Sequence, residues 1–275
     1  MPQPLVALLT DFGTSDAYVG VMKGVILSRC PDVRFIDITH HVSPQNIRQA
    51  AYLLHSAYRY FPAHTIFLTV VDPGVGTERG ALVIQTDHGI YVGPDNGLFS
   101  SILEEVDTWQ AVTLWSQAPL SATFHGRDLF APAAADLACG RSLSEIGSPT
   151  ADVFQLNLFP IRRIAPDTLE GEIIHIDHFG NLVTSLGPFE WDSDAHNLLS
   201  TKLDIVTRAS SITVSFGEWQ ITGIHATYGL TRPGDLLALI NSDRRLEIAV
   251  NQGSAAELTG AKLGDPVKLT FKPRS

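Results

Sequence analysis

The chain has 275 residues, of which 44% are hydrophobic and 17% charged, and its formal net charge is −10. This composition is typical of a globular protein with enough sequence for two domains. The acidic balance argues against nucleic-acid binding, which needs a basic face to neutralise phosphates. The longest apolar stretches fall far short of the roughly 20 residues that span a bilayer, so we expect no membrane role.

Cysteine usage indicates a reducing compartment. Cys30 and Cys139 are the only cysteines, and neither belongs to a Cys-x-x-Cys motif. No signal-peptide pattern precedes Leu5. We therefore expect a cytoplasmic protein that needs no disulfide.

Residues 1–160 alternate short apolar strands with helical segments. Strands are expected at 5–9, 34–38 and 65–71, helices at 16–29, 43–60, 96–105 and 129–139, and a hairpin at 80–85 and 89–93. This alternation predicts an α/β domain with a mostly parallel sheet between helices.

The pattern changes after residue 160. Residues 161–170 contain Pro166 and show no periodicity, which predicts a linker. Residues 171–275 carry short strand candidates separated by Gly, Asn, Asp and Pro, at 171–177, 182–185, 203–206, 211–216, 236–241, 246–250 and 267–271. This spacing predicts a small all-β, barrel-like domain.

Apolar runs in the first domain end in short polar turns that carry ionisable groups. The run ending at Val71 is followed by Asp72, a Pro-Gly-x-Gly turn and Arg79, and a later turn carries His125. Such an arrangement places a carboxylate at the edge of a sheet and brings a guanidinium close to it. The alternatives are a turn-forming aspartate, its ion-pair partner and a half-buried structural histidine.

Two further carboxylates, Asp11 and Asp16, bracket the turn between the first strand and the first helix. Ionised carboxylates accept hydrogen bonds, so this pair suits the adjacent hydroxyls of a ribose. Alternatively, Asp16 is the N-cap of a helix beginning at Ala17.

Several common motifs are missing from the sequence. Gly80 falls one position too late for a G-x-G-x-x-G fingerprint, and there is no HExxH, G-x-S-x-G or P-loop lysine. These gaps argue against a dinucleotide cofactor and a catalytic metal.

The second domain contains a candidate ligand turn between two strands, at 176–182. Its glycine and asparagine, Gly180 and Asn181, suit a hairpin that needs positive φ. Alternatively, Phe179 stacks on a base while the Asn181 amide reads an adenine edge.

Together the motifs resemble the S-adenosyl-L-methionine hydroxide adenosyltransferases, relatives of fluorinating and chlorinating enzymes. The resemblance runs nearly end to end, through residues 10–13, 71–77, 93–97, 124–128, 177–181 and 246–251. It implies that Asp72, Arg79 and His125 handle hydroxide. It also implies a set of substrate contacts: the ribose at Asp11 and Asp16, methionine at Asp177 and Ser242, adenine at Phe179, Asn181 and Tyr228, and a further contact at Asn251.

Departures from the halogenating relatives favour water as the nucleophile. Those enzymes carry an aromatic residue where this chain has Asp72, and a halide-contacting serine where it has Gly126. The loop that they insert after this region is absent, and Asp243 stands where they have an arginine. A carboxylate repels halide and can orient water.

The expected function is hydrolysis of S-adenosyl-L-methionine to adenosine and L-methionine by attack at C5′. The resemblance implies no cofactor and no metal, and a homotrimer with sites between subunits. Alternatives are a halogenase, a non-catalytic adenosyl-nucleoside-binding protein and a metal-dependent hydrolase.

Overall fold

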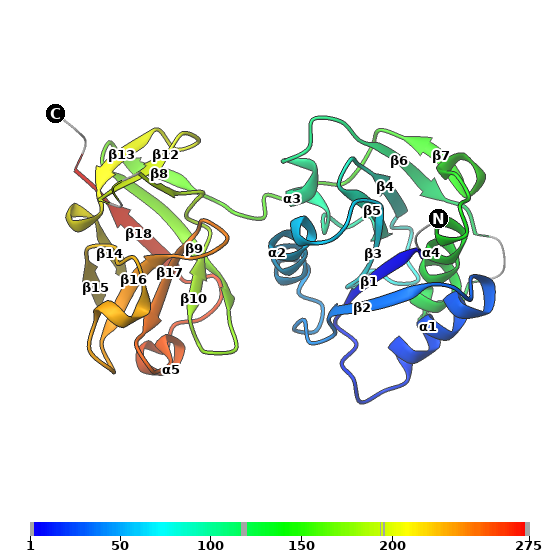
Figure 1. Cartoon of the computed structure of the whole chain (residues 1–275), viewed down its shortest axis with the longest axis horizontal. Coiled ribbons are helices and arrows are strands. Elements are labelled where there is room, and N and C mark those ends of the chain that lie inside the picture. The colour runs from blue at the N-terminus through cyan, green and yellow to red at the C-terminus, as the bar shows by residue number, and fades with distance from the viewer. Residues whose placement is uncertain (1–2, 117–119, 193, 195, 273–275) are drawn as a thin grey trace. The chain divides into compact units, whose positions relative to one another are not determined.

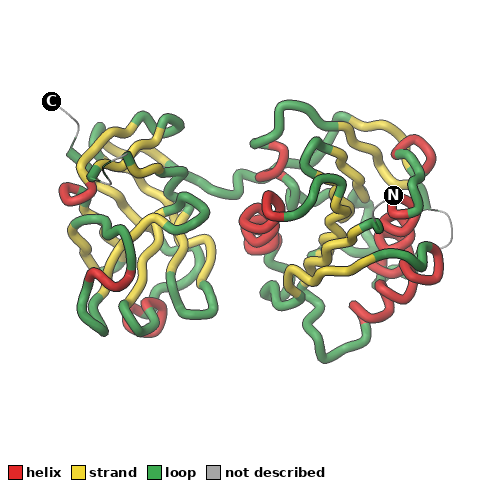
Figure 2. Tube along the Cα trace, viewed as in Figure 1, coloured by secondary structure: helices red, strands yellow, loops and turns green. Residues whose placement is uncertain are grey.

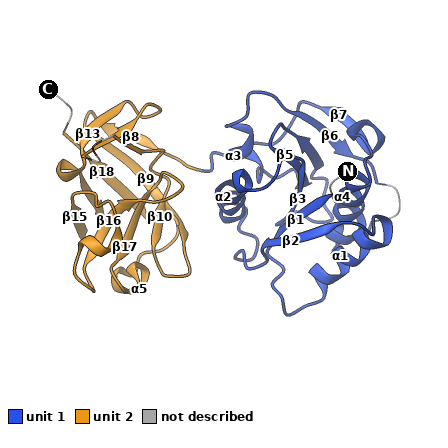
Figure 3. Cartoon of the chain, viewed as in Figure 1, with its two compact units in different colours: residues 1–158 blue, residues 159–275 orange. Residues whose placement is uncertain are grey.

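The computed structural model describes residues 3–116, 120–192, 194 and 196–272 (Figure 1). Its chain forms two compact units, residues 1–158 and 159–275 (Figure 3). Within the described residues, no helix combines the length and the apolar character needed to cross a membrane.

The first unit is built on a seven-stranded sheet in the order β2-β1-β3-β5-β4-β6-β7. Strands β2, β1, β3 and β5 run parallel, whereas β4, β6 and β7 pair antiparallel. The strands are β1 (Leu5–Thr10), β2 (Arg34–Thr39), β3 (Thr65–Val70), β4 (Ala81–Gln85), β5 (Gly89–Pro94), β6 (Gln110–Leu114) and β7 (Gly147–Thr150). The α/β prediction and the hairpin are confirmed, and β6 and β7 extend the sheet beyond the expected strands.

Helices cover both faces of this sheet, because alternate residues of each strand point to opposite sides. Val6 and Leu8 pack with helices α1 (Tyr18–Arg29) and α4 (Ala131–Ala138). Leu9 packs on the other face with α2 (Ile47–Ala57) and α3 (Ser100–Leu103). Strands β1 and β3 are therefore buried on both sides, whereas the edge strand β2 is partly exposed. Figure 2 shows the strands and the helices along the chain trace.

Helix boundaries differ from the prediction for local reasons. The Asn46 side chain accepts a hydrogen bond from Gln49 N at 3.0 Å, so α2 begins after Asn46 rather than at Ser43. The helix expected at 96–105 shrinks to the single turn of α3. A π-helical turn, Gly126–Phe130, leads directly into α4. Such turns are frequent at functional sites.

A cluster of polar side chains ties α2 to the segment after α3. Glu105 accepts hydrogen bonds from His55 Nε2 at 3.0 Å and Tyr58 OH at 2.8 Å, and pairs with Arg59. Burial alone would raise the pKa of Glu105, but these donors together lower that pKa to about 2. Glu105 therefore stays ionised down to strongly acidic pH.

This cluster predicts a pH-dependent contribution to stability. The lowered pKa means that Glu105 stabilises the fold above its ordinary pKa of 4.5 and loses that effect as pH falls toward about 2. Because the side chain is 31% exposed, we expect Glu105→Gln to lower the free energy of unfolding at neutral pH by only about 1 kcal/mol. Urea titrations should show this difference shrinking below pH 4.5, with the exposed Asp107→Asn as control. A difference that does not vary with pH would contradict the assignment.

The second unit is an antiparallel, nearly closed barrel-like sheet, as predicted, with strand order β15-β14-β18-β9-β10-β17-β16 and β8 paired to β9. A three-stranded sheet, β11-β12-β13, and helix α5 (Ala255–Thr259) complete it. The strands are β8 (Arg162–Ala165), β9 (Thr168–Ile176), β10 (Leu182–Thr184), β11 (Glu190–Trp191), β12 (Asn197–Ser200), β13 (Ile205–Arg208), β14 (Thr213–Phe216), β15 (Trp219–Thr222), β16 (Leu236–Ile240), β17 (Leu246–Val250) and β18 (Pro266–Thr270). Its core includes Leu169, Leu182 and Ile248.

The expected linker at 161–170 is wrong. Strand β8 pairs antiparallel with β9, placing Arg162 opposite Glu170, and the two side chains form an ion pair at 2.6 Å. Pro166 lies in the turn between the strands. The proline that suggested a linker thus belongs to a hairpin.

Candidate active site

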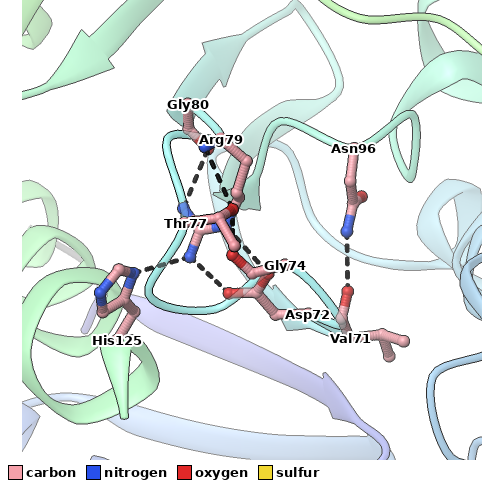
Figure 4. A network of polar contacts seen from close by, with 8 residues as sticks. All are labelled: Val71, Asp72, Gly74, Thr77, Arg79, Gly80, Asn96 and His125. Atoms are coloured by element: carbon pink, nitrogen blue, oxygen red, sulfur yellow. Dashed lines mark hydrogen bonds and ion pairs between the residues drawn. The ribbon is translucent and has the colours of Figure 1, made fainter. Parts of the chain in front are cut away.

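The ends of parallel strands assemble the ionisable residues of the first unit. Strands β1, β3 and β5 are neighbours with parallel register, so their carboxyl ends share one edge. Asp11 follows β1, Asp72 follows β3 and Asn96 follows β5. His125 reaches the same site from the segment that precedes α4 (Figure 4).

Asp72 and Arg79 form a two-pronged ion pair. Arg79 Nε donates to Asp72 Oδ1 at 2.9 Å, and Arg79 Nη2 donates to Oδ2. Arg79 Nη1 donates to the Gly80 carbonyl at 2.9 Å. The side chains are only 5% and 11% exposed, so water screens the pair weakly. This fork fixes the plane of the guanidinium.

His125 completes a continuous three-residue network. Its Nδ1 lies 2.8 Å from Arg79 Nη2. Because a guanidinium can only donate, Nδ1 accepts, and the proton of the neutral ring sits on Nε2. Burial, followed by the charge of Arg79, lowers the pKa of His125. The histidine is therefore held neutral, with its N–H on the side away from Arg79 (Figure 4).

The turn between Asp72 and Arg79 is shaped by glycine. Val75 N donates to Asp72 O at 3.2 Å and Thr77 N donates to Gly74 O at 3.1 Å. Gly76 has φ +77°, and a Cβ there would lie 2.2 Å from the Ala122 carbonyl oxygen. Only glycine allows this approach, which seats the turn against the segment leading to His125.

Asn96 anchors the strand end that presents Asp72. Its Nδ2 donates to the Val71 carbonyl at 2.9 Å, and its Oδ1 accepts from Leu98 N at 3.3 Å. The motif containing Asn96 was recognised in the sequence, but this role was not. A side-chain hydrogen bond to a backbone carbonyl 25 residues away cannot be recognised from the local sequence.

The two candidate ribose carboxylates differ in their hydrogen bonds and exposure. Asp11 Oδ2 accepts from Gln45 N at 2.8 Å. Asp16 is exposed and, among the described residues, has no hydrogen bond or ion pair. The N-cap of α1 is Ala17, which makes no side-chain cap, so the alternative of Asp16 as the N-cap is wrong.

An aromatic cluster joins the loop of Asp11 and Asp16 to the segment of His125. The rings of Phe12, Tyr18 and Phe124 lie 5.2 to 6.1 Å apart between centroids, at tilted or edge-on angles. A Cβ on Gly126 would lie 3.1 Å from both Met22 Sδ and the Phe124 ring. Glycine at 126 therefore leaves room for this packing.

In the second unit, Asp177 organises the turn that carries Phe179 and Asn181. Asp177 Oδ1 accepts from Phe179 N at 2.8 Å and Asn181 N at 2.9 Å, while Oδ2 accepts from Asn181 Nδ2 at 2.9 Å. Gly180 has positive φ, as a tight turn requires. The Asn181 amide is buried, whereas Phe179 projects with 73% of its surface exposed.

The other predicted substrate residues lie in the same unit. Ser242 is exposed in the turn between β16 and β17. Asn251 is buried and donates through Nδ2 to Thr231 O at 2.7 Å. Tyr228 is half-exposed and donates to Glu247 Oε1 at 2.7 Å.

Glu247 is a buried carboxylate that the sequence reading missed. Leu246, Ile248 and Val250 of β17 point into the barrel core, which places Glu247 on the opposite face. It is only 4% exposed, and burial raises its pKa. The sequence feature that could have indicated it is a single charged residue inside the apolar run Leu246–Val250.

The hydrogen bond from Tyr228 to Glu247 predicts a difference in stability between two Glu247 variants. Glu247→Gln keeps an acceptor for the Tyr228 hydroxyl and should change the free energy of unfolding by less than about 1 kcal/mol. Glu247→Ala removes the acceptor and leaves a cavity, which should cost about 2 kcal/mol. Urea unfolding of both variants beside the parent chain measures this. Equal losses would show that the hydrogen bond does not stabilise the fold.

Comparison with known proteins assigns the family. The SAM hydroxide adenosyltransferase N-terminal domain matches residues 6–147, and the C-terminal domain of the same family matches residues 171–268. The chain belongs to the SAM hydroxide adenosyltransferase family. A protein of Salinispora tropica named (R)-S-adenosyl-L-methionine hydrolase is 35% identical, with 98% of each chain covered. A fluorinase of Actinopolyspora mzabensis is 26% identical over 98% of this chain and 97% of its own.

A solved structure supports the fold of this hydroxide adenosyltransferase family member. An uncharacterised conserved protein from Thermotoga maritima matches with a TM-score of 0.82 and 34% identity, covering 96% of this chain and 99% of that one. The first family domain holds Asp72, Arg79 and His125, and the second holds the Asp177 turn. Among the described residues, no three His, Cys, Asp or Glu side chains are grouped to hold a metal ion.

Proposed function

We propose that this chain hydrolyses S-adenosyl-L-methionine to adenosine and L-methionine by attack of water at C5′ of the ribose. The observation that carries the proposal is the buried network of Asp72, Arg79 and His125 at the sheet edge. Family membership and a full-length relative named as a hydrolase of this substrate support it.

The leaving group needs little help from the protein. The sulfonium sulfur accepts the electron pair of the breaking C5′–S bond and departs as the neutral thioether of methionine. The nucleophile is the difficult partner, because bulk water has a pKa of about 15.7. Catalysis must therefore come from positioning water and stabilising the negative charge that develops on its oxygen.

Each member of the network has a chemical role in this step. Arg79 supplies positive charge beside the attacking oxygen, and His125 offers its Nε2–H as a donor. Both Asp72 oxygens accept from Arg79, yet each keeps a second acceptor site that can orient the water and take its proton. A halide at this position would meet the same carboxylate and be repelled, which favours water as the nucleophile.

The substrate contacts are proposed from the resemblance. Asp11 and Asp16 hold the ribose hydroxyls, and Asp177 and Ser242 contact methionine. Phe179, Asn181, Tyr228 and Asn251 complete the set, with the exposed ring of Phe179 suited to stacking on adenine. We further propose a homotrimer, which sedimentation of the purified chain would test, and a reaction without cofactor.

One assay separates the proposed function from its rivals. Purified protein is incubated with S-adenosyl-L-methionine, with and without chloride, fluoride and chelator, and the products are identified by mass spectrometry. Hydrolysis predicts adenosine and methionine in every arm. A 5′-halonucleoside would indicate a halogenase, and loss of activity with chelator a metal-dependent hydrolase. Calorimetric binding without turnover would indicate a non-catalytic binding protein.

The state of His125 predicts the acid side of the pH profile. Because its pKa lies below the ordinary 6.5, the neutral ring persists as pH falls through 6.5. Turnover should hold steady there and decline only at lower pH, when the ring gains a proton. His125→Gln should lower kcat about 10²-fold and remove this decline. A decline of the same midpoint in the variant would assign it to another group.

The lowered pKa of His125 also makes the stability of the fold depend on pH. Below pH 6.5 the unfolded chain binds a proton at His125 before the folded chain does, so folding loses stability as pH falls. Activity in this range should therefore be corrected for the folded fraction, measured by circular dichroism at each pH.

A further inference from the structure

Two cysteines lie at the same end of neighbouring helices in the first unit. Cys30 is the C-cap of α1, with its N–H bonded to Ile26 O, and Cys139 is the C-cap of α4, with its N–H bonded to Ala135 O. Both helices pack on the same face of the sheet (Figure 1). Positions more than a hundred residues apart in the chain thus come together.

The two thiols lie close to each other. Cys139 Sγ donates to the Arg29 carbonyl at 3.5 Å, which places it beside the residue that precedes Cys30. Cys139 is also one of the neighbours that raise the pKa of Cys30. Both cysteines are free in the structure.

The two thiols differ in exposure, and this difference sets the order in which they react. Cys139 is exposed, whereas Cys30 is 7% exposed and belongs to the hydrophobic core. A small oxidant can therefore reach Cys139 first. Cys30 is then the nearby thiol that can react with the oxidised form of Cys139.

We propose that Cys30 and Cys139 form a reversible dithiol–disulfide site that exchanges with small disulfides. The Cys139 thiolate attacks a disulfide R–S–S–R, forming a mixed disulfide and releasing one thiolate RS⁻. The Cys30 thiolate then attacks the Cys139 sulfur, closing the protein disulfide and releasing the second RS⁻. Two protein thiols are oxidised and one small disulfide is reduced to two thiols.

The second step should be the slow one. Burial, together with the Cys139 thiol and the Asp32 carboxylate, raises the pKa of Cys30 to about 11. Few Cys30 thiolates exist at neutral pH, so the mixed disulfide should accumulate before closure. Closure should become faster as pH rises toward that pKa.

The crosslink should stabilise the fold without reaching the candidate active site. It joins the C-terminal ends of α1 and α4, whereas Asp16 and His125 precede the N-terminal ends of these helical segments. A long closed loop restricts the unfolded chain, so the oxidised form should need more urea to unfold.

Mass spectrometry of the full chain tests the proposal. The parent chain, Cys30→Ser and Cys139→Ser are treated with oxidised glutathione and denatured at intervals. The parent should first gain one glutathione adduct and then lose it, ending lighter than the reduced chain by two hydrogens. Cys30→Ser should stop at the adduct, and Cys139→Ser should gain none.

Two results would overturn the proposal. One is a parent chain that retains its adduct even at alkaline pH, which would mean that Cys30 cannot reach Cys139. The other is a chain that forms only covalent dimers, seen on a non-reducing gel. The assay involves no adenosyl substrate, so its outcome is independent of the proposed hydrolysis.

Discussion

Arg79→Lys should lower kcat about 10³-fold while changing KM by less than about threefold. A lysine ammonium carries the same charge but cannot form the fork that Arg79 makes with Asp72, or donate to His125 at the same time. The loss should therefore fall on the transition state, where the orientation of the nucleophile matters, rather than on substrate binding.

A matched control separates this effect from a general cost of losing arginine. Arg141 also pairs with a neighbouring carboxylate, donating through Nη1 to Asp136 Oδ2 at 3.1 Å, but its side chain is 40% exposed and lies outside the network. Arg141→Lys should leave both kcat and KM unchanged. If Arg79→Lys instead raised KM with kcat unchanged, Arg79 would serve binding alone.

Asp72→Asn should have the second large effect, and it should act on both turnover and stability. The amide keeps the shape of the carboxylate but carries no charge, so it cannot take a proton from water. We expect kcat to fall about 10³-fold or more. The buried Arg79 also loses its counter-charge, which should lower the free energy of unfolding by about 3 kcal/mol.

Kinetics and urea unfolding of the same preparation distinguish these two losses. The kcat is calculated per folded molecule, and the exposed Asp87→Asn serves as the control carboxylate. The double variant Asp72→Asn/Arg79→Lys should lose much less than the sum of the two single losses, because the residues act as one unit. Additive losses would mean that Asp72 and Arg79 act separately.

The sequence was most informative where topology dictates position. Parallel strands bring their carboxyl ends to one edge, so placing Asp72 and Arg79 there required only recognition of the strand before them. The geometry of the network was not predictable in the same way. The tautomer of His125 follows from the Arg79 contact, which joins segments distant in the chain.

The sequence predictions were wrong where one local pattern is compatible with two structures. Pro166 suggested a break in structure, yet it lies in the turn of the β8–β9 hairpin. Asp16 has the residue type of a helix cap, but α1 begins after Ala17. Glu247 was overlooked because its strand reads as uniformly buried, although its side chain contacts Tyr228 on the face opposite the barrel core.

The origin of the new oxygen tests the central claim most directly. The purified chain is given S-adenosyl-L-methionine in water enriched in heavy oxygen, and the products are analysed by mass spectrometry. Attack by the water held at Asp72, Arg79 and His125 predicts adenosine labelled in its 5′-hydroxyl together with unlabelled methionine. Unlabelled adenosine, or release of methylthioadenosine or free adenine instead, would contradict it.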